Sequence, residues 1–314
     1  MERFALAAAV VLGFALTAAL CSLFVPLRRV LERREQNQQP AQSEQPRPAP
    51  LRAPLWGGLC AAAGTVAAVG VGWLAACVGQ PELLGSEGRL MTRLLTALAG
   101  SLAFGAVGLA EDLARMRSPA ALGLRRDVRL LLEALAAAFV LLLLQAAGCL
   151  PRGLDVPGAG YVLLGSAVPF LWAVLMVALA ECARIAERDE GTVCGAAFVA
   201  MLALMMAEAG LGVPGLAVLP AALAGALVAL LLWAFPPARL GVGCCGSLLA
   251  AGAIGCIPLS LDMTSLTVPL ALPFWAAGGL LAAQLLGAKR TGKPLRCWVK
   301  KHKMSPETVF LCSF

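Results

Sequence analysis

Residues 214–234 read PGLAVLPAALAGALVALLLWA and contain no charged side chain. A stretch of about 20 apolar residues is what an α-helix needs to cross the hydrocarbon core of a bilayer. The rest of the chain has the same character: 60% of its 314 residues are hydrophobic, only 14% are charged, and the mean hydropathy is +0.83. A water-soluble domain cannot bury so much apolar side chain, so the composition indicates a polytopic membrane protein.

The apolar segments predict an all-α fold. Backbone groups that face lipid must be hydrogen-bonded within their own segment, which a helix achieves, and the abundance of Ala, Gly, Leu and Val suits close helix packing. We expect a transmembrane helical bundle of nine spans plus a truncated tenth, for which the apolar tail at 308–314 is too short. The expected spans cover residues 4–26, 55–78, 91–110, 128–149, 160–182, 192–211, 214–234, 246–262 and 267–287.

The positive charges predict the orientation of this bundle. If the N-terminus lies outside, all but four of the 25 Lys and Arg residues fall in cytoplasmic loops, as the positive-inside rule requires. The net charge of +7 then needs no nucleic acid as a partner. We predict a single integral-membrane domain over 1–314, with a mobile, proline-rich cytoplasmic loop at 27–54 and a basic cytoplasmic tail at 288–314.

Two kinds of polar residue within the spans have structural interpretations. The eleven cysteines form no Cys-x-x-Cys pair, so we expect buried free thiols that behave as small apolar side chains. Glu133 lies inside the fourth span, where a buried carboxyl group is a functional candidate. We nevertheless expect it to make a structural hydrogen bond.

Acidic residues mark the cytoplasmic ends of the third and fifth spans. The segment GLAEDLARM at 108–116 places Glu111 and Asp112 at the membrane boundary, where they could hold Mg²⁺, take a proton from a phosphate, or only cap the span. In LAECARIAERDEG at 179–191, Glu181, Arg184 and Glu187 are three residues apart and could pair as ions on one helical face. Alternatively, Arg184 could bind a pyrophosphate through its planar guanidinium group.

The loop PPARLGVGCCGSL at 236–248 carries the clearest family resemblance. Its frame of Gly243, Gly246, Ser247 and Leu248 resembles the last catalytic loop of the phospho-N-acetylmuramoyl-pentapeptide transferases, which reads Gly-Asp-x-Gly-Ser-Leu. These enzymes belong to the polyprenyl-phosphate hexosamine-1-phosphate transferase superfamily, also called glycosyltransferase family 4. Cys244 stands where that family has the aspartate that holds magnesium.

Other segments resemble the same family in order and spacing. Glu111-Asp112-x-x-Arg115 is similar to its Asp-Asp-x-x-Lys motif, and residues 53–58 are similar to Thr-Pro-Thr-Met-Gly-Gly. Four further positions align with the Asn, Asn, Asp and Asp of a loop that helps to bind the uridine nucleotide: Glu181, Arg184, Glu187 and Glu190.

The basic tail resembles the last conserved segment of these enzymes. Residues 291–293 match its Thr-Gly-Lys, and His302 takes the place of the first residue of a histidine trio, whose other two positions hold Lys303 and Met304. Without the resemblance, the basic run at 289–303 would be interpreted as a contact with anionic lipid headgroups.

The resemblance implies a reaction and a set of site residues. Family members move phospho-MurNAc-pentapeptide from its UDP carrier to undecaprenyl phosphate with Mg²⁺, in peptidoglycan synthesis at the bacterial cell membrane. The implied partners are a polyprenyl phosphate lipid and a UDP-sugar nucleotide; a homodimer is left open. The implied residues are Glu111, Asp112 and His302 for catalysis, Glu181, Arg184, Glu187, Glu190 and Lys293 for substrate, and Glu111, Asp112 and Glu187 for metal.

Cys244 leaves two hypotheses about activity. A thiol is a soft ligand and a poor substitute for the hard oxygen ligands that Mg²⁺ requires. The chain is then either a divergent transferase that has rebuilt its site, or a pseudoenzyme that binds a lipid phosphate or a protein partner without catalysis. The sequence leaves open whether the protein is an enzyme.

Overall fold

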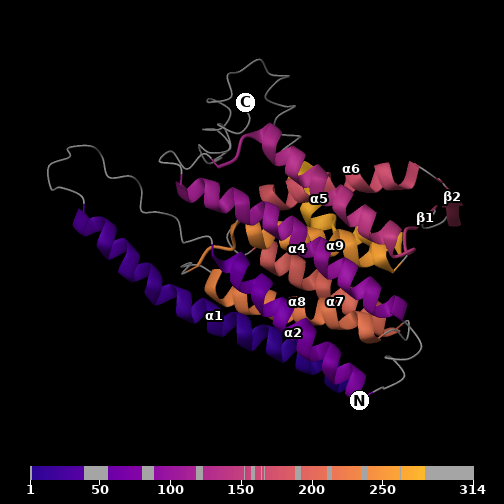
Figure 1. Cartoon of the computed structure of the whole chain (residues 1–314), viewed down its shortest axis with the longest axis horizontal. Helices are drawn as coiled ribbons and strands as arrows, with labels where there is room; N and C mark the ends of the chain where they lie inside the picture. Colours follow the sequence, from indigo (N-terminus) through magenta and orange to yellow (C-terminus); the bar gives the residue numbers. More distant parts are fainter. Residues whose placement is uncertain are drawn as a thin grey trace.

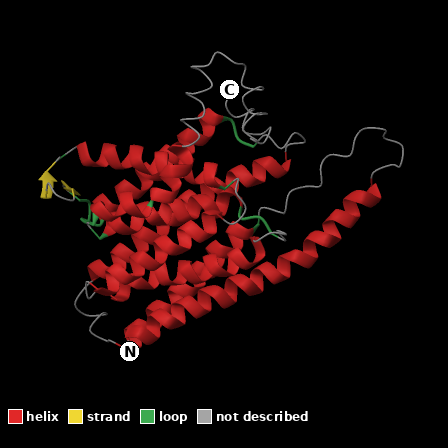
Figure 2. Ribbon diagram, turned by 180° about the vertical axis from the view of Figure 1, so that it is seen from behind, coloured by secondary structure: helices red, strands yellow, loops and turns green. Residues whose placement is uncertain are grey.

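The computed structural model describes most of the chain as a bundle of helices (Figures 1 and 2). The long helices are α1 (Glu2–Gln38), α2 (Gly57–Gly79), α4 (Gly88–Arg117), α5 (Arg126–Ala146), α6 (Ala167–Ala186), α7 (Thr192–Gly210), α8 (Pro214–Ala234) and α9 (Gly243–Ser260). A 3₁₀ turn (η1, Thr264–Leu266), α10 (Thr267–Leu270) and helical residues 272–279 follow. The described residues are 2–38, 56–79, 88–117, 123–151, 153–156, 160–163, 165, 167–187, 192–210, 214–234, 240–261 and 263–279.

The helices confirm a multi-pass membrane protein. Within the described ranges, seven helices are long and apolar enough to cross a bilayer, namely α1, α2, α4, α6, α7, α8 and α9. The count of nine spans and a truncated tenth is not confirmed: the predicted span at 128–149 coincides largely with α5, and the last helical stretch is described only as far as residue 279.

A short β-hairpin interrupts the helices before α6. Strand β1 (Gly153–Val156) pairs antiparallel with β2 (Gly160–Leu163), with Gly153 opposite Leu163. The prediction that the fifth span begins at residue 160 is therefore wrong, since α6 begins at Ala167. The segment Gly160–Leu163 reads GYVL, whose aromatic and β-branched residues favour a strand, and the glycines and proline before it favour a tight connection.

Helix α1 extends beyond the predicted first span, whose range of 4–26 agrees with the membrane-spanning part of the helix, Ala5–Val25. Helix α1 continues without interruption to Gln38, so the first part of the loop predicted at 27–54 is helical. The remainder of that loop, residues 39–54, and the tail at 288–314 lie outside the described residues.

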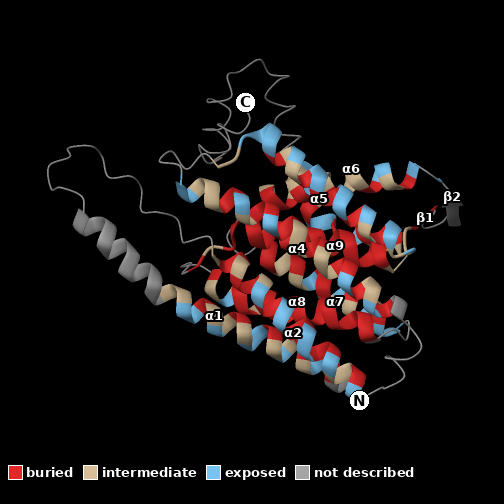
Figure 3. Ribbon diagram, in the orientation of Figure 1, coloured by how far each residue is buried: buried red, intermediate tan, exposed pale blue. Residues whose placement is uncertain are grey.

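Helices α8 and α9 form the centre of the bundle (Figure 3). Every residue of α9 is buried, whereas α1 alternates between buried and exposed positions along the edge. Helix α9 is built largely from Gly, Ala, Cys and Leu, so neighbouring backbones can approach it closely on every side. Its N-terminus is thereby held firmly against α2 and α4.

Glycines bring α4 and α9 into direct backbone contact. The two helices run antiparallel: Gly100 of α4 lies against Cys256, Gly105 lies against Leu249, and a Cβ atom added at Gly108 would collide with the carbonyl group of Cys244. This approach sets the end of α4 directly beside the start of α9.

The loop before α9 is also fastened to the start of α2. The Gly57 N–H donates to the Gly241 carbonyl at 3.2 Å, and the Gly58 N–H donates to the Val242 carbonyl at 2.9 Å. Gly243 has φ of +72°, a left-handed conformation that glycine adopts without steric cost. The glycines at the start of α2 (Gly57, Gly58) and those before α9 (Gly241, Gly243) therefore form one structural unit.

Candidate functional site

The polar cluster at the start of α9 gathers side chains from four helices. The end of α4 contributes Glu111, Asp112 and Arg115, the end of α6 leads to Glu187, and α9 contributes Cys244. The first turns of α5 contribute Arg129, which reaches both Glu111 and Glu181. The cluster joins three of the loops that the sequence singled out.

Asp112 binds the N-terminus of α9 with both carboxylate oxygens. The backbone N–H of Cys244 donates to Oδ1 at 3.0 Å, and that of Cys245 donates to Oδ2 at 2.9 Å. The first N–H groups of a helix have no partner within the helix, and the helix dipole favours a negative charge there. Asp112, which is only 1% exposed, therefore acts as a helix cap supplied by another helix.

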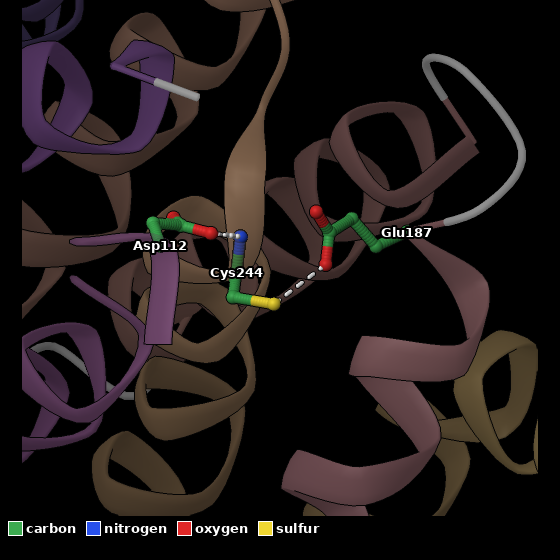
Figure 4. A group of neighbouring side chains, drawn as sticks. All are labelled: Asp112, Glu187 and Cys244. Atoms are coloured by element: carbon green, nitrogen blue, oxygen red, sulfur yellow. Dashed lines mark hydrogen bonds between the residues drawn. The ribbon is translucent and has the colours of Figure 1, made fainter. Parts of the chain in front are cut away.

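Cys244 faces Glu187 on its other side (Figure 4). Its thiol donates a hydrogen bond to Oε2 of Glu187 at 3.0 Å. Burial raises the pKa of Glu187 above its usual value, while the nearby guanidinium group of Arg115 opposes that shift. Glu187 directly follows the last residue of α6, so the length of that helix determines its position.

Asp112, Glu187 and Cys244 form a candidate metal site. Each offers one donor atom, and these atoms all lie within 4.8 Å of one another. The donor set is two carboxylates and a buried thiol, whereas Mg²⁺ selects oxygen ligands in near-octahedral geometry. The described residues therefore provide a place for a cation but do not fit the Mg²⁺ that the family resemblance implies.

Arg115 is the site arginine most open to solvent. Its Nη2 lies 2.8 Å from Oε1 of Glu111, and its Nη1 lies 3.8 Å from Glu187 and 4.0 Å from Asp112. The side chain is 25% exposed, compared with 4% for Arg129 and 7% for Arg184. Among the described site arginines, Arg115 is therefore the best placed to meet an anion from solution.

Glu181 forms the centre of a second set of ion pairs, which Arg129 links to Glu111. Glu181 accepts a hydrogen bond from Arg184 Nη2 at 2.6 Å and one from Arg129 Nε at 2.8 Å. The predicted pairing of Glu181 with Arg184 is confirmed. Glu187 does not join Arg184 as an ion pair among the described contacts but lies nearest to Arg115, because it comes after the helix has ended.

The structure brings together most of the residues predicted from the sequence. Five of them share one network: Glu111, Asp112, Glu181, Arg184 and Glu187. The other three, Glu190, Lys293 and His302, lie outside the described residues.

Arg115, Arg129 and Cys244 are site residues that the sequence analysis did not assign. The spacing of four residues between Glu111 and Arg115 was a signal for an ion pair. A lone arginine within the apolar fourth span was a signal for Arg129. Cys244 was interpreted only as a loss, because sequence reasoning compared it with the aspartate of the family.

The contacts of Glu133 differ from those predicted from the sequence. Both of its carboxylate oxygens are buried without a hydrogen-bond partner, and its nearest ionic partner is Arg129 Nε at 3.9 Å. The predicted structural hydrogen bond is therefore absent from the described contacts. Instead, Glu133 places a buried carboxyl group beside Arg129.

A known protein family matches the part of the chain that contains this cluster. The family model "Glycosyl transferase family 4" matches residues 94–262, which include Asp112, Glu187 and Cys244. The chain belongs to this family.

Individual relatives agree with the resemblance seen in the motifs. The phospho-N-acetylmuramoyl-pentapeptide-transferase of Mycobacterium tuberculosis is 28% identical over 265 residues, covering 76% of this chain and 72% of that protein. The protein of the same name from Synechococcus sp. is 30% identical over 212 residues, covering 67% and 55%. That of Desulforudis audaxviator is 32% identical over 170 residues, covering 51% and 50%.

Proposed function

We propose that this protein transfers a phospho-sugar from a UDP-linked donor to a polyprenyl phosphate, at the cytoplasmic face of a bacterial membrane. The observation that supports this function is the convergence of Asp112, Glu187 and Cys244 from three helices at one end of the bundle. Each lies in a segment that resembles a family motif, and membership of glycosyl transferase family 4 supports the same assignment.

The chemistry would be phosphoryl transfer by displacement. An oxygen of the lipid phosphate forms a bond to the phosphorus that carries the sugar, the bond from that phosphorus to the bridging oxygen breaks, and UMP leaves. Negative charge grows on the leaving phosphate, and a fixed cation stabilises it. We assign that role to Arg115, whose guanidinium is held by Glu111 and is partly open to solvent.

Transfer of labelled phospho-sugar to undecaprenyl phosphate by the purified protein tests this function. The wild type should form the lipid product in the presence of divalent cations, and Arg115→Ala should reduce the rate by about 100-fold or more, the usual cost of losing one charge-stabilising donor. Arg125→Ala is the matched control, since the Arg125 side chain is 86% exposed and pairs only with exposed Asp127 among the described contacts.

Each result of this assay either supports or contradicts the proposed transferase function. Product from the wild type and from Arg125→Ala, with little from Arg115→Ala, supports the proposal. No product from folded wild-type protein with Mg²⁺, Mn²⁺ or Zn²⁺ contradicts it, and so does equal activity in the two variants.

A second candidate function is favoured by the ion pairs around Glu181. Glu181 and Arg184, which align with the two asparagines of the family's nucleotide-binding loop, pair with each other, and Arg129 also donates to Glu181. The alternative is a non-catalytic homologue that binds a lipid phosphate or a protein partner. Undecaprenyl phosphate that co-purifies or binds in nanodiscs, without any transfer from UDP-sugars, would support this alternative.

A further inference from the structure

We propose that Asp112, Glu187 and Cys244 bind a thiophilic divalent cation of the Zn²⁺ type, in place of the magnesium that the family resemblance implies. The site is the one in which we place the transferase reaction, but the binding itself does not depend on turnover. The inference rests on the donor atoms, on their geometry and on the charge of the surrounding cluster.

The chemical identity of the three donor atoms determines which metal ion the site prefers. Zn²⁺ is a borderline-soft ion that accepts thiolate and carboxylate ligands together, most often in tetrahedral sites, and three protein ligands are typical where a fourth position stays open. Mg²⁺ demands six oxygen ligands and does not use sulfur. A change from aspartate to cysteine at position 244 therefore changes which ion the site prefers and does not by itself remove the site.

The geometry is close to what such an ion needs. Donor atoms in a tetrahedral zinc site are roughly 3.5 Å apart, given metal–ligand distances of about 2.0–2.3 Å. The three donors here already lie within 4.8 Å of one another, and Cys244 Sγ is 3.0 Å from Oε2 of Glu187. Both oxygens of Asp112 keep a free lone pair after accepting their backbone hydrogen bonds.

The electrostatics of the cluster provide an independent reason for a cation. Its described members are the three arginines at 115, 129 and 184 and five acids: Glu111, Asp112, Glu133, Glu181 and Glu187. The acids outnumber the arginines by two.

One carboxylate oxygen of the cluster has no hydrogen-bond partner. Oε2 of Glu111 is buried without a hydrogen bond, while Oε1 of the same side chain contacts the guanidinium of Arg115, which also lies near Asp112 and Glu187. A divalent ion held by the donors would favour the ionised form of these buried carboxyl groups and balance their charge. Among the described residues, Arg115 is the one cation within ion-pair distance of the donors, and its contacts with Asp112 and Glu187 are 4.0 and 3.8 Å long.

Binding would exchange one set of contacts for another. The Cys244 thiol would lose its proton to solvent, as thiolate ligation requires. Its hydrogen bond to Glu187 would be replaced by coordination of both groups to the ion. The fourth ligand would be water or a phosphate oxygen of a substrate.

Metal titration of the full-length protein in detergent tests this inference. Protein stripped with EDTA is titrated with Zn²⁺ by calorimetry, and with Co²⁺ while the near-ultraviolet absorption that reports a thiolate–cobalt bond is followed. We expect one tight Zn²⁺ site that excess Mg²⁺ does not displace. Cys244→Ser should weaken binding by more than the roughly 10- to 100-fold that loss of an outer-shell partner costs, and should abolish the cobalt band.

Cys245→Ser is the matched control. Cys245 is the next residue, is equally buried, and donates its backbone N–H to Asp112, but its thiol is not part of the donor group. It should bind Zn²⁺ like the wild type. Cys244→Asp should lower the preference for Zn²⁺ over Mg²⁺.

The results distinguish this inference from the proposed function. Zn²⁺ binding that is equal in wild type and in folded Cys244→Ser overturns the metal site, and so does a wild type that binds no Zn²⁺. A Zn²⁺ site that depends on Cys244, in protein without transferase activity, supports the metal site and contradicts only the proposed function.

Discussion

Asp112 has a structural role that exists without any substrate. Its two oxygens hold the N-terminus of α9, and the cap comes from a helix 132 residues earlier in the chain. A residue that resembles a catalytic carboxylate of the family therefore also fixes the position of Cys244. Loss of activity in an Asp112 variant would not, by itself, prove a catalytic role.

The stability of Asp112→Asn follows from this cap. An amide has one acceptor oxygen and no charge, so one of the two N–H groups loses its acceptor. Hydrogen bonds to charged groups contribute about 1.5–3 kcal/mol each. We expect a lower melting temperature for the Asp112→Asn protein in detergent. The measurement is the amount of folded protein that remains on size-exclusion chromatography after heating. Asp127→Asn, at an 85% exposed position, should melt like the wild type; equal melting of the two variants would show that the cap is unimportant.

At the scale of elements, the contact between α4 and α9 positions the site. Gly108 allows the end of α4 to reach the carbonyl group of Cys244, while Gly70 of α2 has open space around its Cα. A methyl group is tolerated only where the neighbouring backbone leaves room for it.

We therefore expect opposite effects from two Gly→Ala substitutions. Gly108→Ala forces α4 and α9 apart, and overpacking of this kind costs about 1–3 kcal/mol. Gly70→Ala should be neutral or stabilising by up to about 1 kcal/mol, because alanine is the better helix former. Thermal melting checks both, and a Gly108→Ala protein as stable as Gly70→Ala would contradict the close backbone contact.

The ion pairs link α5 to α6 across the bundle. Arg129 of α5 donates to Glu181 of α6 from a side chain that is only 4% exposed. Arg129→Met removes the cation and leaves Glu181 with only one of its two arginine partners. Breaking a buried pair in this way costs about 3–5 kcal/mol. We expect a lower melting temperature or a lower expression level for Arg129→Met. Arg126→Met, at an exposed position of the same helix, should behave like the wild type.

At the scale of the whole molecule, the orientation in the membrane follows from the loops. Described arginines cluster where α4 ends (Arg115, Arg117) and α5 begins (Arg126, Arg129), at the end of the bundle that carries the site, which predicts that this end is cytoplasmic. The β-hairpin at 153–163 should then lie outside. Alkaline phosphatase, which is active only outside the cytoplasm, should be active when fused after residue 156 and inactive when fused after residue 125. The reverse pattern would refute the predicted topology.

Much of the fold could be predicted because its determinants are local. Eight of the expected spans correspond to long helices, since uninterrupted apolar sequence and helical hydrogen bonding are properties of each segment alone. The sequence missed the β-hairpin, because Gly160–Leu163 is apolar enough to be read as the start of a span. It predicted the membrane-spanning part of α1, but not that the polar residues after the apolar stretch continue the helix to Gln38.

The site was predicted as a list of residues and not as an arrangement. Glu111, Asp112 and Glu187 were expected to act together, and they share one cluster in the structure. Their partners were not foreseen: Glu187 faces the thiol of Cys244 and the guanidinium of Arg115, not Arg184. Such pairings depend on helix ends and on interhelical distances, which motif spacing does not contain.

The sequence by itself determined that this protein is a membrane-embedded helical bundle with motifs similar to one transferase family, because hydropathy and short motifs are read along the chain. Only the tertiary structure decided what those motifs form together. Cys244 lies 57 residues from Glu187 and 132 residues from Asp112. It meets Asp112 because glycines allow α4 and α9 to touch, and it meets Glu187 because α6 also packs against α9. That contact makes the cysteine a third donor beside two carboxylates.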